Sequence, residues 1–102
     1  MSTLLMRPEE LATQIGQTMR LARAAQGLRQ EDLSDRSQAS LQAIKNLEAG
    51  GKVELLTFLR VAHALNLSDA ILQACQPQAR SLDDIERMES ARNTGSRVRL
   101  KK

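Results

Sequence analysis

Four side chains fall on the outward side of a short helix expected from Ser40 to Glu48, and they are Leu41, Gln42, Lys45 and Asn46. The amides of Gln42 and Asn46 each offer an acceptor and two donor hydrogens. Ile44 and Leu47 fall on the opposite side, toward a core. A helix of this kind can pack its apolar side against the rest of the protein and present its polar side to base edges in a DNA groove. Alone, such a pattern more often marks a solvated helix face than a binding site, so the surrounding elements decide.

The sequence lacks the groups of residues that usually carry out catalysis or bind metals. His63 is the only histidine and Cys75 the only cysteine. We expect His63 to be a structural or surface residue and Cys75 to be a small buried hydrophobe. There is no recognisable set of nucleophile, base and metal ligands, and no glycine-rich phosphate loop. The sequence therefore predicts a protein that is not an enzyme, with no catalytic residue, metal site or cofactor.

The composition favours one small helical protein. The chain has 102 residues, of which 41% are hydrophobic and only 1% aromatic. A core of Leu, Ile, Val, Met and Ala is typical of packed helices. A single cysteine cannot close an intrachain disulfide, and neither a leader segment nor an apolar run of about 20 residues is recognisable. We therefore expect a cytoplasmic protein with no membrane partner.

Charge is divided unevenly along the chain. All 12 acidic residues lie at or before Glu89, whereas the segment from Arg92 to Lys102 carries five basic residues and no acidic one. Because the formal net charge is +3, the rest of the chain carries −2. Three roles are open to the basic segment: solubilising disorder, contact with DNA phosphates or a minor groove, and docking to a protein partner.

Apolar periodicity and capping residues predict a series of helices. The first helix runs from Pro8 or Glu9 to Gly27 and has the apolar stripe Leu11, Ile15, Met19 and Ala22; the second runs from Gln30 to about Arg36 with Leu33 facing inward; and the third begins at Ser40 and is ended by Gly50 and Gly51. The fourth has the apolar stripe Leu55, Phe58, Leu59 and Ala62 and ends near Asn66. The fifth is capped by Ser68 and runs from Asp69 to about Cys75, and the sixth runs from Ser81 to about Arg92. Ser81 and Asp84 have the spacing of a capping box. Residues 93–102 are expected to form a flexible tail.

The second and third helices are joined by three residues, a length that sets consecutive helices at a steep angle. The pattern Leu28-x-Gln30-Glu31-x-Leu33, then Ser40-x-x-x-Ile44-x-x-Leu47-Glu48-x-Gly50, resembles the helix-turn-helix of phage repressor and Cro type (Xre) proteins. The resemblance covers about Arg20 to Cys75. It implies an all-α, five-helix lambda-repressor-like DNA-binding domain over residues 1–76, followed over residues 77–102 by a short C-terminal helix and a flexible basic tail.

The resemblance also implies a function and the residues that carry it, namely sequence-specific regulation of transcription by binding double-stranded DNA. Base contacts would come from Leu41, Gln42, Lys45 and Asn46, and phosphate contacts from Arg23, Arg29, Gln30, Ser40 and Lys52. Arg23 and Glu48 hold positions that form a structural ion pair in this family.

Three residues depart from the family pattern. Arg29 stands where a capping Thr or Ser is usual, and its side chain cannot accept an amide proton, so the second helix is expected to fray more. Gln38 stands at a turn position that commonly holds Gly, where a left-handed conformation costs roughly 1 to 2 kcal/mol. Leu41 stands at a position where a polar side chain usually contacts a base. These departures affect the expected base preference and not the fold.

The helix from Ser40 to Glu48 would contact only a few base pairs, so two copies are needed for useful specificity. The resemblance therefore implies a homodimer on a palindromic operator with half-sites about 34 Å apart. The expected interface is apolar and includes Leu67, Ile71 and Leu72. The small size and basic extension are also similar to HipB-type antitoxins, which implies autorepression and a HipA-like kinase toxin as a partner. The alternatives are a stand-alone phage-type repressor and a protein-interaction adaptor on the same scaffold, the latter suggested by an exposed Leu41.

Overall fold

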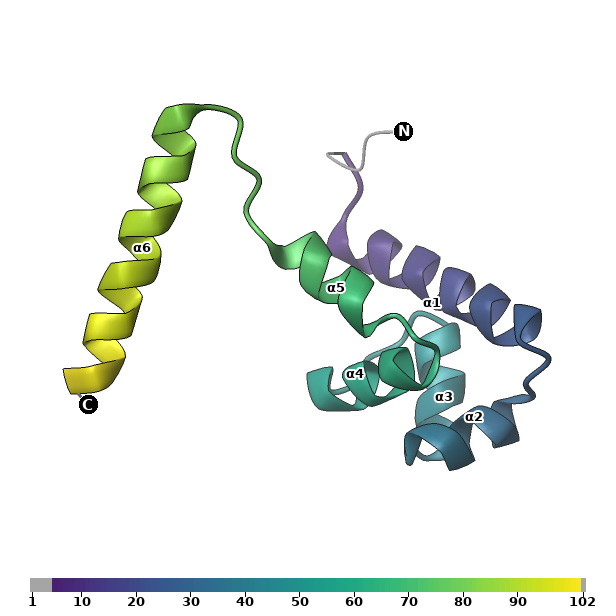
Figure 1. Ribbon diagram of the computed structural model, residues 1–102. Helices are drawn as coiled ribbons and strands as arrows, with labels where there is room; N and C mark the ends of the chain where they lie inside the picture. The colour runs from purple at the N-terminus through teal and green to yellow at the C-terminus, as the bar shows by residue number, and fades with distance from the viewer. Residues whose placement is uncertain (1–4, 102) are drawn as a thin grey trace. The chain divides into compact units, whose positions relative to one another are not determined.

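The computed structural model describes the backbone of residues 5–101 and the side chains of residues 5–94. Within these limits the chain is all-helical, with six helices and no strand (Figure 1). The helices are α1 (Pro8–Ala25), α2 (Gln30–Ser37), α3 (Leu41–Glu48), α4 (Leu55–Ala64), α5 (Ser68–Cys75) and α6 (Leu82–Lys101). The prediction of an all-α protein is therefore confirmed, and the first five helices lie close to their expected bounds.

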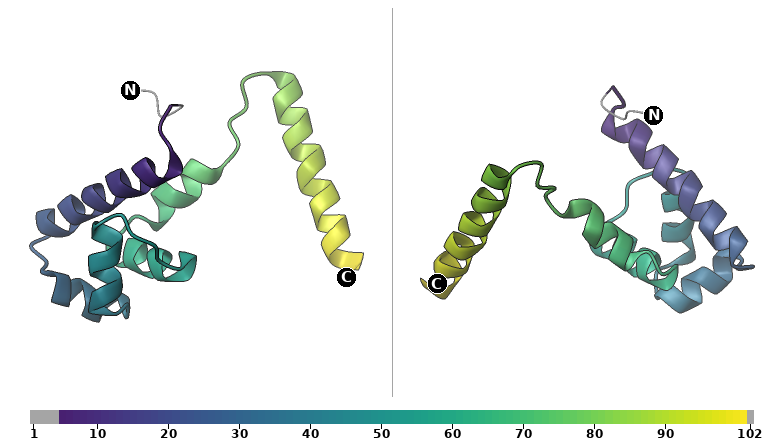
Figure 2. Two further views of the ribbon diagram at one scale, coloured as in Figure 1. Left: turned by 180° about the vertical axis from the view of Figure 1, so that it is seen from behind. Right: turned by 45° about the horizontal axis from the view of Figure 1, so that its top comes forward.

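The chain divides into two compact units, with the boundary along the sequence within α5, after Ile71. In the first unit, α1 packs against α3, while α2 packs against both α3 and α4 (Figure 2). Nine apolar side chains form its core, namely Met19, Leu28, Leu33, Ala39, Ile44, Leu47, Val61, Ala62 and Leu65. Leu33, Ile44 and Leu47, the residues predicted to face inward from α2 and α3, all belong to this core, so the helix-turn-helix is fixed by packing on both of its helices.

The predicted stripes on α1 and α4 are buried only in part. In α4 the predicted residues Phe58 and Ala62 do lie on the inner side, together with Val61, whereas Leu55 remains 71% exposed and Leu59 36% exposed. Near the start of α1, Leu11 is 41% exposed. Both helices thus bury part of their apolar surface and leave other apolar side chains uncovered.

A capping residue at each end delimits α3. Ser40 caps α3, since its Oγ accepts a hydrogen bond from the backbone N–H of Ala43 at 3.0 Å. After α3, Gly50 has φ +80°, and the N–H groups of Gly50 and Gly51 donate to the carbonyls of Leu47 and Asn46. This is a Schellman ending, which needs a left-handed residue and therefore favours glycine. The sequence indicated both ends correctly.

The turn between α2 and α3 contains the strained residue that the sequence suggests. Gln38 adopts φ 63° and ψ 18°, in the left-handed region. The turn is supported from both sides, because the Ser34 hydroxyl donates to the carbonyl of Ala39 at 2.6 Å and Ser37 Oγ accepts the Ala39 N–H at 3.2 Å. These bonds offset the conformational cost of a residue with a Cβ at this position.

The second unit contains α6, which differs from the expected short helix followed by an irregular tail. α6 has 20 residues and its helical backbone extends to Lys101, beyond the expected end near Arg92. Arg, Leu and Lys, which dominate its last turns, are good helix formers. At its start the Asp84 N–H bonds Ser81 Oγ at 3.2 Å, but the Asp84 carboxylate accepts from the backbone of Arg80 and not of Ser81.

Candidate nucleic-acid interface

α3 separates an apolar back from a polar front. Ile44 is fully buried and Leu47 is 6% exposed, so the back of the helix is anchored in the core. Gln42, Lys45 and Asn46 are all exposed on the other side. The helix therefore presents two amides and an ammonium group on a surface that cannot rotate without unpacking Ile44.

Leu41, expected on the outward side, is only partly exposed. Leu41 is the first residue of α3. This position still leaves part of its surface for an apolar contact such as a thymine methyl group. Leu41 is thus less exposed than the protein-interaction alternative assumed, but it is not buried.

Gln42 and Asn46 are hydrogen-bonded to one another across one turn of α3. Gln42 Nε2 donates to Asn46 Oδ1 at 3.0 Å. A pair of this kind stabilises a helix by only about 0.2 to 0.5 kcal/mol, whereas a bidentate contact to a base discriminates by roughly 1 to 3 kcal/mol. The bond therefore orients the two amides in the free protein and is weak enough to be replaced by a contact to another partner.

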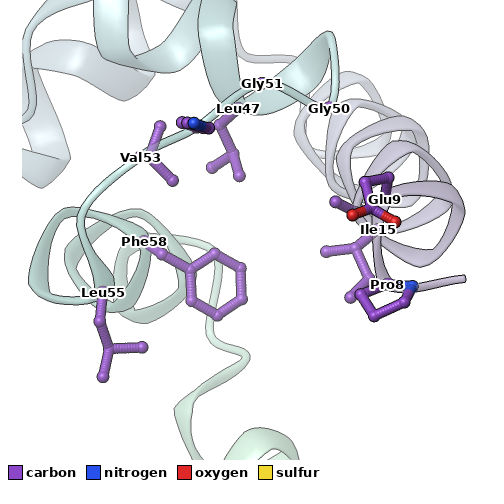
Figure 3. Close-up of a pocket in the computed structure, with 11 residues that line it drawn as sticks. Pro8, Glu9, Ile15, Leu47, Gly50, Gly51, Val53, Leu55 and Phe58 are labelled. Atoms are coloured by element: carbon purple, nitrogen blue, oxygen red, sulfur yellow. The ribbon is translucent and has the colours of Figure 1, made fainter.

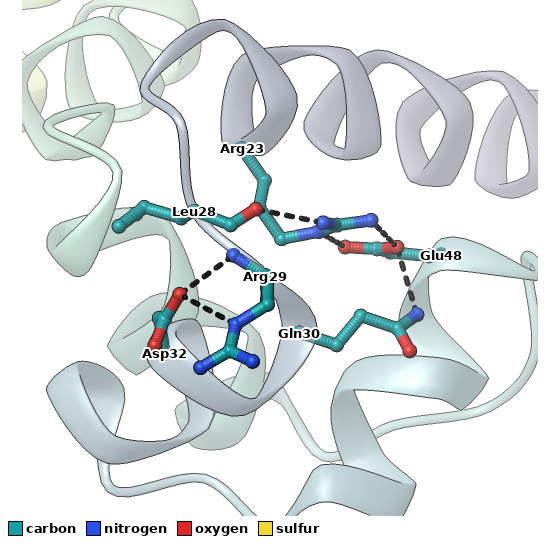
Figure 4. Close-up of polar contacts among 6 residues, drawn as sticks. All are labelled: Arg23, Leu28, Arg29, Gln30, Asp32 and Glu48. Atoms are coloured by element: carbon teal, nitrogen blue, oxygen red, sulfur yellow. Dashed lines mark hydrogen bonds and ion pairs between the residues drawn. The ribbon is translucent and has the colours of Figure 1, made fainter.

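Arg23 and Glu48 form a bidentate ion pair between α1 and the end of α3 (Figure 4). Arg23 Nε donates to Glu48 Oε2 at 2.6 Å and Nη2 donates to Oε1 at 2.9 Å. The side chains are 13% and 6% exposed, respectively. Arg23 Nη1 also donates to the carbonyl of Leu28 at 2.9 Å, just before α2. One guanidinium thus joins α1, the approach to α2 and the end of the reading helix.

Gln30 belongs to the same cluster, a link that the sequence pattern did not reveal. Its Nε2 donates to Glu48 Oε1 at 3.1 Å, so Glu48 binds both Arg23 and Gln30 (Figure 4). One hydrogen on Nε2 and the Oε1 acceptor of Gln30 remain for other partners. The amide expected to meet a DNA phosphate is therefore fixed to the last residue of the reading helix.

The ionised form of Glu48 is favoured despite its burial. Desolvation raises the pKa of this carboxyl, but hydrogen bonds from Arg23 and Gln30, together with the charge of Arg23, outweigh it and hold the pKa below its usual value of 4.5. For Arg23, the hydrogen bond from its side chain to Glu48 raises the pKa further above its already high usual value, against the opposing effect of burial. Both groups are charged at neutral pH.

This lowered pKa predicts a pH dependence of stability. A depressed carboxyl pKa contributes stability that is complete above the unfolded value of 4.5 and is lost as pH falls through the folded value. The difference in unfolding free energy between the wild type and Glu48→Gln should therefore be constant near neutral pH and shrink in acid. Urea unfolding across this pH range measures it, and a difference that grows toward acid pH contradicts the assignment.

The start of α2 uses Asp32 in place of the missing cap. The backbone N–H of Arg29 donates to Asp32 Oδ2 at 2.9 Å, and Arg29 Nε lies 3.5 Å from the same oxygen. The backbone hydrogen bond, followed by the side-chain bond, lowers the pKa of Asp32. Half of a capping box is thus present, which limits the fraying expected from Arg29, and the exposed guanidinium lies beside the helix terminus.

Close backbone approach fixes the distance between α1 and α3. A Cβ added to Gly16 would collide with the carbonyl oxygen of Leu47 and lie 3.1 Å from that of Glu48. A Cβ at Gly50 would lie 2.7 Å from Cα of Thr13. Neither glycine was predicted to act in this way, although a glycine inside a helix costs about 1 kcal/mol relative to Ala and so indicates a packing role.

The remaining phosphate candidates lie at the two ends of α3. Ser40 is exposed at the N-terminal end, and Lys52 is exposed just beyond the C-terminal end. Lys52 also borders a mostly apolar groove of about 620 Å³ between α1 and α4, whose lining includes Ile15, Leu55 and Phe58 (Figure 3). None of the four expected base readers lines this groove.

The residues expected at a dimer interface differ in exposure. Leu67 and Ile71 are partly buried against the core, while Leu72, the next residue along α5, is 64% exposed. Ser68, expected to cap α5, is instead its first residue, and its hydroxyl lies 3.0 Å from Nδ1 of the exposed His63. Cys75 is exposed and not buried as predicted, because it is the last residue of α5 and its side chain lies outside the core.

The fold and the site together define a helical protein in which a short helix packs its apolar side into the core, exposes its polar side, and is joined to α1 by a buried ion pair. The family model for helix-turn-helix proteins matches residues 19–72. The chain therefore belongs to the helix-turn-helix family, of the Cro/C1 type that the sequence pattern resembles, and this is a family of DNA-binding transcription regulators. Comparisons with the curated proteins and with the solved structures found no match. In the described part of the chain, no helix has the length and apolarity to cross a membrane.

Proposed function

We propose that the protein is a sequence-specific, dimeric repressor that reads a palindromic operator with α3. The observation that carries the proposal is the rigid placement of Gln42, Lys45 and Asn46 on the exposed side of a helix whose back is buried. Gln42 and Asn46 are suited to adenine, and Lys45 to guanine or a phosphate. The partly exposed Leu41 supplies apolar surface for a thymine methyl group.

Phosphate contacts position the reading helix in this proposal. Gln30 binds a phosphate with the hydrogen that Glu48 leaves free, next to the unpaired N–H groups at the start of α2. Arg29, Ser40 and Lys52 are all exposed and add further donors. Arg23 has its guanidinium occupied by Glu48 and Leu28, so its contribution is to hold Gln30 and α3 in place.

Two copies of α3 are required for useful specificity, and we place the dimer contact at α5 in the manner of lambda-repressor-like domains. Leu72 offers the exposed apolar surface, and Leu67 and Ile71 connect it to the core. The reading helices then lie about 34 Å apart, one turn of DNA. Bound at its own promoter, such a dimer represses by excluding polymerase.

Loss of the two amides should abolish preference for the operator. For Gln42→Ala/Asn46→Ala we expect at least tenfold weaker binding to the DNA upstream of the gene, since each lost base contact costs roughly 1 to 3 kcal/mol. Binding to scrambled DNA should be unchanged. Fluorescence anisotropy at several salt concentrations measures both. Equal, salt-sensitive and sequence-indifferent binding by the wild type and the variant would refute specific regulation.

A second candidate function is that of an antitoxin that also binds a HipA-like kinase. The observation that favours it is the second unit, where Leu82 and Ile85 expose apolar surface that base reading does not use. Purification of the chain from a strain that carries the whole operon tests this function. A co-purifying kinase supports it, and a clean homodimer argues against it.

A further inference from the structure

The guanidinium of Arg23 has a protein partner at each of its three nitrogens. Nε and Nη2 donate to the Glu48 carboxylate, and Nη1 donates to the carbonyl of Leu28. Turning this group toward DNA would leave a buried carboxylate without its counter-charge. The phosphate contact that the family resemblance implies for Arg23 is therefore better supplied by another cation.

Arg20 lies one turn before Arg23 on the same side of α1. Gly16, Arg20 and Arg23 follow one another at steps of four and three residues, which places them in line along one face of the helix. This face is turned toward the end of α3, because Gly16 approaches the carbonyl oxygen of Leu47 and Arg23 forms its ion pair there. Arg20 therefore starts from the contact between α1 and α3, and its side chain is exposed.

The charge of Arg20 acts on Glu48 without forming an ion pair. The pKa of Glu48 responds most to burial and to the contacts described above, and the charge of Arg20 lowers it further. Such an effect declines with distance, so the Arg20 guanidinium lies in the neighbourhood of the cluster formed by Arg23, Glu48 and Gln30. None of the ion pairs among the described residues includes Arg20. An exposed arginine beside the cluster is thus available to a ligand.

A phosphate held by Gln30 needs such a cation. Gln30 donates to Glu48 and is followed in the chain by Glu31, so two carboxylates lie close to this amide. Arg23 neutralises the first of them. Glu31 is exposed in the first turn of α2, where it would repel a phosphate. Arg20 has the position and the charge to offset this repulsion.

We propose that Arg20 is a phosphate-binding residue that contacts the DNA backbone beside the phosphate held by Gln30. This inference rests on the proposed DNA binding and adds to it a contact that the sequence pattern did not indicate. A guanidinium can bind two phosphate oxygens through parallel N–H groups. Because a phosphate carries no information about base sequence, Arg20 contributes affinity for the operator and for unrelated DNA alike.

The salt dependence of DNA binding by the full chain tests the proposal. For Arg20→Gln, the slope of log K against log salt concentration should decrease in magnitude by about 0.9 for each bound copy. At 0.1 M salt, binding should weaken by roughly tenfold per contact on both the DNA upstream of the gene and a scrambled duplex. Arg20→Lys keeps the positive charge and should keep most of the slope. Fluorescence anisotropy over a series of salt concentrations measures these quantities.

Arg60→Gln is the matched control, since it removes the same charge from an exposed position of α4. It should keep the slope and the affinity of the wild type. Urea unfolding supplies a second control, because a phosphate contact contributes nothing to the free protein. Arg20→Gln should therefore unfold at nearly the same urea concentration as the wild type.

Three results would overturn the proposal while the wild type still binds DNA. They are a wild-type slope for Arg20→Gln, a loss of affinity confined to the operator, and a loss of stability like that of a variant that lacks Glu48. The last two would show that Arg20 acts through Glu48 and α3 instead of on a phosphate. A wild type that binds neither duplex would instead refute the proposed DNA binding itself, so the two failures are distinguishable.

Discussion

Glu48→Ala is expected to destabilise the domain by about 3 to 5 kcal/mol and to abolish operator binding, because it removes one partner of a buried ion pair. Arg23 would keep its charge at 13% exposure with no carboxylate to neutralise it. Gln30 would lose the acceptor that holds its amide. Urea unfolding at neutral pH measures the loss of stability. A loss below about 1 kcal/mol would contradict the proposed role of the pair.

A double substitution separates the effect of the ion pair on the stability of the domain from its effect on the position of Gln30. In Arg23→Met/Glu48→Leu both charges are replaced by apolar groups, and such replacements are often neutral or stabilising. We expect this variant to recover most of the stability lost in Glu48→Ala. Its operator binding should stay weak, because Gln30 still lacks Glu48. Full recovery of DNA binding together with stability would show that Glu48 acts on folding alone.

Gly16→Ala is expected to destabilise the domain by about 1 to 3 kcal/mol, the typical cost of overpacking. The added methyl group would collide with the carbonyl oxygen of Leu47, which belongs to the backbone and cannot move to another rotamer. Relief requires α1 to move away from the end of α3, which also strains the bond between Arg23 and Glu48. Thermal unfolding and operator titration should therefore both be affected.

Whether Gly16→Ala lowers or raises stability is informative, because alanine favours a helix over glycine by about 1 kcal/mol and would stabilise α1 if there were room for its methyl group. Gln17→Ala, at the next and exposed position of α1, is the matched control and should change stability by less than about 0.5 kcal/mol. If Gly16→Ala stabilises the protein, the close approach of α1 and α3 does not constrain the fold.

The first five helices could be predicted from sequence because their signals are local. Ser40 accepts the Ala43 N–H, Gly50 is left-handed after α3, and Ile44 repeats with Leu47 on the buried side. Each signal depends on residues within one or two turns. The left-handed Gln38 was predictable from the family pattern, in which this turn position commonly holds Gly.

The features that sequence reasoning missed depend on contacts between distant segments. The bond from Gln30 to Glu48 and the approach of Gly16 to Leu47 join residues of different helices. Leu55 has an apolar side chain in a helical stripe, yet no element covers it among the described residues. Cys75 was expected to be buried on residue type alone, but α5 ends there without packing around it. The extension of α6 was missed because charge was taken as a sign of disorder.

Selection of preferred sites from random double-stranded DNA by the full chain tests the central claim most directly, and Gln42→Ala/Asn46→Ala is run in parallel. The account predicts that the wild type enriches an inverted repeat with half-site centres about 10 base pairs apart, and that the variant enriches no sequence at the positions read by these amides. Recovery of random sequence by the wild type, or of the same repeat by both proteins, would contradict base reading by α3.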